Sequence, residues 1–208
     1  IPLAFGIYVA YVTKAIILAL PCIVLAVPAG IATTALYYAV NKVIRHSRGY
    51  LWSSFWHSFR SNMKQGALVT LIVAAAVVLV GLDGYIMYQF AKAGEKSGAL
   101  YVVFFVLMLV VIAWAVYVFP YMARFENTTK MILKNSALMA IGNLPKTFMS
   151  LMFFLACCIG TYLLPVVAII SPALATLLLN YILEGVFERY MSDEDREAEN
   201  ERNQEFYN

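Results

Sequence analysis

Two neighbouring apolar stretches decide the fold: GALVTLIVAAAVVLVGLDGYIMYQF at residues 66–90 and ALYVVFFVLMLVVIAWAVYVFPYMA at residues 99–123. The second stretch contains no charged residue, and the first contains only Asp83. A run of about 18 or more apolar residues is long enough to cross a bilayer as a helix. Both stretches are apolar all round, unlike the amphipathic helices of a soluble domain. They therefore predict a transmembrane helical hairpin.

The same apolar character extends over most of the chain, which is 62% hydrophobic and only 13% charged. A typical soluble domain carries about 25% charged residues. Residues 147–183 are uncharged but too long for one span, and Pro165 and Pro172 divide them into two helices. We predict an all-α, polytopic transmembrane helical bundle that forms one domain at residues 1–191. Its spans, about five, are expected at residues 8–28, 66–90, 99–123, 147–164 and 173–190.

Basic loops set the expected orientation, because membrane segments rich in Lys and Arg face the cytoplasm. Residues 41–64 are basic without any acidic residue, and residues 124–146 are also basic. Both segments are expected in the cytoplasm, so residue 1 lies outside and the C-terminus inside. The acidic residues 192–208 are expected to form a cytoplasmic tail. Two layouts of the first forty residues stay open, because the first span can end near Val27 and be followed by a separate helix.

Three interfacial helices are expected on the cytoplasmic side, at residues 32–46, 51–64 and 124–144. In LWSSFWHSFRSNMK, residues 51–64, apolar side chains recur every four residues from Leu51 to Met63 beside two tryptophans. This pattern is typical of a helix that lies in the headgroup layer. The segments 51–64 and 124–144 supply a candidate surface for lipids or a partner protein: Trp52, Phe55, Trp56, Phe59, Arg60, Asn62, Lys64, Arg124, Phe125, Glu126, Lys134 and Asn135.

An internal duplication is a further hypothesis, because a basic helix precedes an apolar hairpin in each half of the chain. The short match is between Arg60-Ser61-Asn62 and Lys134-Asn135. The positive-inside rule alone also explains two hairpins of like orientation.

Ionisable groups in a membrane are candidate functional residues, and Lys14 and Asp83 form the candidate intramembrane pair. Asp83 lies about 28 Å of helix from Lys64, near the outer surface, so an interfacial role competes with a role in ion or substrate binding. No zinc-peptidase, nucleotide-binding or serine-nucleophile motif is present in the sequence. We expect no enzyme activity, no cofactor, no metal site and no nucleic-acid partner.

A longer pattern, ATTALYYAVNKVIRHSRGYLWSSFWHSFRSNMKQGAL at residues 32–68, resembles the YesL family of small bacterial integral membrane proteins of unknown function. A second similar stretch covers residues 120–147. Arg60, Met63 and Gly66 depart from the lysine, phenylalanine and alanine of the family pattern. The residues that match the pattern are Thr34, Ala35, Leu36, Tyr37, Tyr38, Arg45, Gly49, Tyr50, Ser58, Phe59, Asn62, Lys64 and Gln65.

The resemblance implies a function, because YesL-like proteins are often encoded beside carbohydrate ABC importers of the oligosaccharide type. It implies an accessory subunit in the bacterial cytoplasmic membrane that contacts lipids and binds ABC permease subunits, with the ATPase as a further partner. It assigns no catalytic residue. The alternatives are a small stand-alone channel or secondary transporter, acting alone or as a homo-oligomer, and a membrane chaperone or adaptor.

Overall fold

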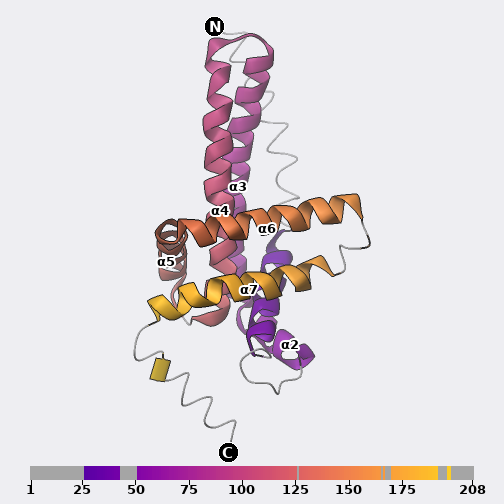
Figure 1. Ribbon diagram of the computed structural model, residues 1–208, viewed down its shortest axis with the longest axis vertical. Helices are drawn as coiled ribbons and strands as arrows, with labels where there is room; N and C mark the ends of the chain where they lie inside the picture. Colours follow the sequence, from indigo (N-terminus) through magenta and orange to yellow (C-terminus); the bar gives the residue numbers. More distant parts are fainter. Residues whose placement is uncertain are drawn as a thin grey trace, which may run out of the picture.

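The computed structural model describes residues 26–42, 51–125, 127–164, 166, 170–191 and 196–197, and every long regular element within them is a helix. Lys14, Glu126 and most of both the first predicted span and the acidic tail lie outside these residues. The elements are a helix at residues 26–42 (helix 26–42), α2 (Leu51–Ser61), α3 (Met63–Lys92), η1 (Lys96–Leu100), α4 (Tyr101–Arg124), α5 (Thr129–Gly142), α6 (Leu144–Leu163) and α7 (Ser171–Tyr190) (Figure 1).

The predicted hairpin is the longest feature of the fold, with α3 and α4 antiparallel and η1 at its tip (Figure 1). Small residues on α3 let the two helices approach closely. A Cβ atom at Gly81 would lie 3.2 Å from Met108 Cε, and one at Gly84 would lie 3.2 Å from Phe104 Cβ. These glycines therefore pack against α4 of the same chain, and they are not available for close packing against a partner.

The tip of the hairpin depends on Gly98, because a Cβ atom at this position would overlap the backbone of Ala91. Backbone atoms cannot swing aside as a flexible side chain can. We expect Gly98→Ala to open the turn and to lower the free energy of unfolding by about 1–3 kcal/mol, as overpacking does elsewhere. Thermal unfolding in detergent measures this. Gly160→Ala is the control, since its Cβ would meet nothing within 4 Å; equal midpoints for the two variants would contradict the prediction.

Figure 1 shows that α6 and α7 run across the hairpin instead of alongside it. The two helices are antiparallel partners: Thr161 Oγ1 donates to Ser171 Oγ at 3.1 Å, and at the other end Lys146 Nζ lies 2.9 Å from the Cβ position of Gly185. Of the described helices, none covers the outer part of the hairpin, where Phe105 is 63% exposed.

Three of the described helices are long and apolar enough to cross a membrane: α3, the segment Gly98–Arg124 and α6. The prediction of an all-helical chain with membrane-spanning helices is confirmed, but the count of about five spans is not. α7 is not among the three, because it mixes apolar residues with Asn180, Glu184 and Glu188. Residues 8–25 of the first predicted span lie outside the described part of the chain.

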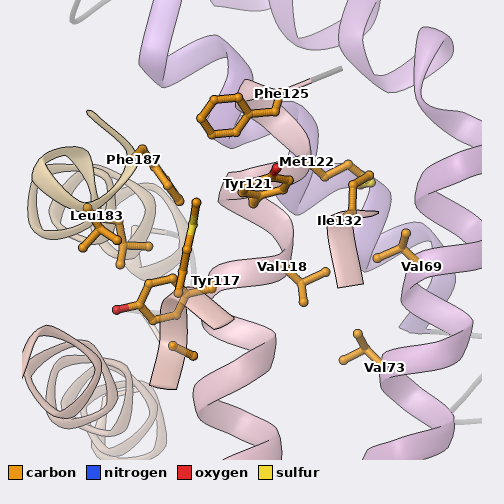
Figure 2. Packing of buried hydrophobic residues seen from close by; sticks show 13 residues of the cluster. Val69, Val73, Tyr117, Val118, Tyr121, Met122, Phe125, Ile132, Leu183 and Phe187 are labelled. Atoms are coloured by element: carbon orange, nitrogen blue, oxygen red, sulfur yellow. The ribbon is translucent and has the colours of Figure 1, made fainter. Parts of the chain in front are cut away.

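The main hydrophobic core joins the hairpin to α5 and α7 (Figure 2). Its largest fully buried side chains include Tyr117, Phe187 and Ile132. The core lies toward the α2 end of the hairpin and fixes the helices that cross it. Its members are Val69, Val73, Tyr117, Val118, Tyr121, Met122, Phe125, Ile132, Met139, Ala140, Leu183, Val186 and Phe187.

Helix 26–42 packs against α3 through glycines on both helices. A Cβ atom at Gly30 would overlap the side chain of Thr70, and one at Gly66 would lie 3.3 Å from Ile31 Cγ1. The described helix already includes residue 26 and contains Pro28 and Gly30. The helix therefore includes residues 26–31 ahead of the predicted start at residue 32, because Gly30 serves close packing and not helix termination. The predicted break between this helix and the first span lies outside the described residues.

A single asparagine links a short helix to a long one at two places in the chain. Asn62 follows α2 and donates from Nδ2 to Ser58 Oγ at 3.2 Å, and Asn143 follows α5 and donates from Nδ2 to Met139 O at 3.1 Å. Each asparagine carbonyl also accepts the N–H of the residue four positions later. By this hydrogen-bond pattern Asn62 resembles Asn143 and not Asn135, and the internal duplication stays a hypothesis.

Candidate functional site

The first part of the predicted surface is α2, which buries two of its serines and exposes its two tryptophans. Ser54 and Ser58 are buried, whereas Trp52 is 72% exposed and Trp56 40% exposed. Small serine side chains allow the helix to lie close to the rest of the protein. The aromatic face, as we call it, is formed by the exposed Trp52 and Trp56 together with Phe55 and Phe59, which are half-buried.

The four rings of the aromatic face contact one another along the helix. The centroids of Trp52 and Phe55 are 6.3 Å apart in a stacked geometry, and those of Trp56 and Phe59 are 5.5 Å apart edge to face. Such pairs stabilise one another by about 0.5–1.5 kcal/mol beyond their buried area. A rigid aromatic surface on a basic helix fits the boundary between acyl chains and headgroups.

An open depression lies on the polar side of the same helix. Ser53, Trp56, His57, Arg60 and Ser61 line it. Each of these side chains carries at least one hydrogen-bond donor when the histidine is counted in either tautomer. None of the described lining residues has a carboxylate, so the depression suits an anionic group.

The second part of the predicted surface contains a partly buried ion pair. Arg124 Nη1 donates to Glu184 Oε2 at 2.6 Å, with the arginine side chain 7% exposed and the glutamate side chain 30% exposed. The guanidinium carbon also lies 5.7 Å from the ring centroid of Phe125 and 5.8 Å from that of Phe187. The arginine therefore ties the end of α4 to α7 through charge and cation–π contacts.

Phe125 itself belongs to the core, where it packs beside Tyr121 and Phe187 (Figure 2). The expectation that Arg124 and Phe125 form part of an exposed surface is corrected by this placement. The reason is that Glu184, far away in sequence, draws the arginine inward to the α4–α7 junction.

A hydrogen-bond network connects the start of α3 to the link between α4 and α5. Tyr121 Oη accepts from Asn127 Nδ2 and from Asn135 Nδ2, both at 2.9 Å. Gln65 Nε2 donates to the backbone oxygen of Asn127 at 2.6 Å. The two predicted segments, residues 51–64 and 124–144, are thus brought together next to Lys64, and Asn135 serves this junction.

We expect Tyr121→Phe to lower the free energy of unfolding by about 1–3 kcal/mol, because both asparagine amides lose their acceptor in a partly buried place. Tyr85→Phe is the matched control, since Tyr85 is 49% exposed on the hairpin. Thermal unfolding of the two variants in the same detergent measures the difference. An unchanged midpoint for Tyr121→Phe would show that water replaces the lost hydroxyl.

With this geometry in view, the chain was compared with known proteins. Residues 9–84 match the model of the DUF624 family, which is described as "Protein of unknown function, DUF624". No curated protein and no solved structure matches the chain. The DUF624 match contains helix 26–42, α2 and most of α3, and therefore the first of the two stretches on which the YesL resemblance rests.

Of the remaining predicted residues, Lys14, Arg60, Lys64 and Asp83 lie within the segment that matches DUF624, whereas Glu126 and Lys134 lie beyond it. Arg60 and Lys64 are exposed, and so is Lys134 on α5. Asp83 is exposed on α3, and because Lys14 and Glu126 lie outside the described residues, the Lys14–Asp83 pair stays a prediction. Among the described residues, no three His, Cys, Asp or Glu side chains gather as metal ligands would.

Sequence reasoning missed two residues that organise the junction, Tyr121 and Glu184. Glu184 had a signal, since an acidic residue inside a predicted apolar span calls for a partner. Tyr121 had none, because a tyrosine in an apolar helix is usually a core residue. The ion pair, the asparagine amides and the aromatic rings of this junction therefore hold helices of the chain together.

Proposed function

We propose that the chain is a non-enzymatic accessory subunit that binds the permease helices of a bacterial oligosaccharide ABC importer within the bilayer. The proposal combines the YesL resemblance with the shape of the hairpin. Its supporting observation is the outer part of α3–α4, which is apolar, exposed and uncovered by the other described helices (Figure 1). A partner helix would contact large side chains there, such as Phe105 and Val110, because the glycines of α3 already face α4.

Aromatic residues at both ends of α3 support a membrane-spanning orientation. The aromatic face of α2 precedes Lys64, and Tyr85, Tyr88 and Tyr101 lie toward the tip, with the rings of Tyr88 and Tyr101 6.1 Å apart. At 1.5 Å of rise per residue, Tyr85 lies about 32 Å from Lys64, close to the thickness of a hydrocarbon core of about 30 Å. Aromatic belts are typical of both membrane surfaces. The basic α2 end would face the cytoplasm.

The channel alternative has less support, because the described polar residues do not gather along one path. Thr161 and Ser171 bond to each other at the α6–α7 turn, and Tyr162 is 86% exposed. Asn180 is buried in α7, whereas Asp83 is exposed on the hairpin. A chaperone or adaptor would use the same exposed hairpin, so the identity of the partner is the property to measure.

The test is purification of the tagged full chain from native membranes in nanodiscs, followed by mass spectrometry. We expect stoichiometric recovery of an ABC permease pair and its ATPase. The variant Phe105→Ala with Val110→Ala should lose them, while Phe148→Ala with Met152→Ala, on the exposed side of α6, should keep them. Recovery of the chain alone, as a monomer or homo-oligomer, would reject the subunit proposal and favour a stand-alone transporter.

A further inference from the structure

We infer that the depression on α2 binds the phosphate group of an anionic phospholipid. This inference deepens the proposed function, because it rests on α2 lying at the cytoplasmic membrane surface. A phosphodiester is an acceptor-only anion, and it binds best where several donors converge around a positive charge. The depression offers the guanidinium of Arg60, the imidazole of His57, the indole N–H of Trp56 and the hydroxyls of Ser53 and Ser61.

The basic groups of the depression are not used by the fold. Arg60 and His57 are exposed, and in the described part of the chain neither pairs with a carboxylate. The buried side of α2 is formed by other residues, Ser54 and Ser58. Residues 41–64 also contain no acidic side chain that could compete for the arginine. The site is therefore electropositive and open to a ligand.

The aromatic face identifies a lipid, and not a soluble phosphate, as the occupant. Trp56 belongs both to the depression and to the aromatic face. A phosphate in the depression would thus place the acyl chains of the same molecule against Trp52, Phe55 and Phe59. A soluble phosphate would add no apolar group to cover Trp52, which is 72% exposed although it contacts Phe55 and Trp56.

The test uses intrinsic fluorescence, because the chain has only three tryptophans, Trp52, Trp56 and Trp114. The purified full chain is reconstituted in phosphatidylcholine vesicles with a minor fraction of phosphatidylglycerol. In one preparation the phosphatidylglycerol carries brominated acyl chains, and in the other an equal amount of the phosphatidylcholine does. We expect brominated phosphatidylglycerol to quench more strongly. One basic side chain at an anionic surface corresponds to roughly a fivefold local enrichment.

Arg60→Gln with His57→Gln should abolish this preference, whereas Lys130→Gln, an exposed basic residue of α5, should retain it. Since both substitutions in α2 lie on its exposed side, unchanged circular dichroism is expected. Equal quenching by the two lipids, or a preference that survives the α2 double variant, would overturn the inference. Relief of quenching by glycerol phosphate would assign the site to a soluble phosphate and overturn it as well.

The readout is independent of any protein partner, because it uses the purified chain alone. Failure to recover permease subunits therefore leaves the lipid preference intact. Conversely, a chain without lipid preference could still bind permease subunits, so the purification from native membranes tests the proposed function separately.

Discussion

Arg124→Met is expected to lower the free energy of unfolding by about 2–3 kcal/mol. Removing one partner of a buried ion pair costs about 3–5 kcal/mol, because it leaves the other charge uncompensated. We place this variant at the lower end, since Glu184 is 30% exposed and water can reach it in part. The cation–π contacts with Phe125 and Phe187 are lost at the same time.

Thermal unfolding in detergent, followed by circular dichroism, measures this loss. Arg189→Met is the control: it removes an exposed arginine from α7, the helix that carries Glu184, and should change the free energy by less than about 0.5 kcal/mol. The double variant Arg124→Met with Glu184→Leu should recover part of the stability, because no buried charge is then left unpaired. A double variant as unstable as the sum of the two single variants would contradict the role of the pair.

The second large effect is expected from Gly30→Val, which should separate helix 26–42 from α3. A Cβ atom at Gly30 would overlap Thr70 Oγ1 and lie 2.8 Å from Thr70 Cβ, nearer than side chains approach in folded proteins. Thr70 cannot turn away easily, since it is buried and its hydroxyl donates to Gly66 O at 2.6 Å. Overpacking of this kind costs about 1–3 kcal/mol or more.

A second substitution at Thr70 distinguishes a steric clash from the loss of the glycine backbone at residue 30. Thr70→Gly removes the atoms in the way, so the pair Gly30→Val with Thr70→Gly should be less unstable than the sum of the two single variants. The measurement is again the unfolding midpoint of each variant. Strict additivity of the two substitutions would mean that Gly30 and Thr70 do not meet in the folded protein.

The local elements of this fold were accessible from the sequence, because each has a clear periodicity or length. The uncharged residues 99–123 predicted α4 almost to its ends, and the four-residue repeat from Leu51 predicted α2. The crossing of α6 and α7 was not accessible. It depends on contacts between distant residues, such as the 2.9 Å bond of Tyr117 Oη with Thr147 Oγ1, which no local pattern encodes.

The candidate site also has features that the sequence predicts and features that it does not. Exposure of Trp52 and Trp56 could be predicted, since large aromatics on a basic helix favour a membrane surface. The burial of Ser54 could not, because the sequence does not say which side of α2 faces the protein. The inward position of Arg124 was also inaccessible, as its partner Glu184 lies on another helix.

The crossing of the hairpin by α6 and α7 also gives the described helices unequal width along the hairpin (Figure 1). If α3 and α4 stand along the bilayer normal with α2 in the cytoplasm, the described helices in the outer leaflet are α3 and α4 alone, whereas those in the inner leaflet also include α6 and α7, which lie across the hairpin. Such a body is a wedge, and it displaces more lipid from one leaflet than from the other. Its preferred surroundings would then be membrane that bends toward the slender end, or a neighbour whose own outline fills the space beside the outer part of the hairpin.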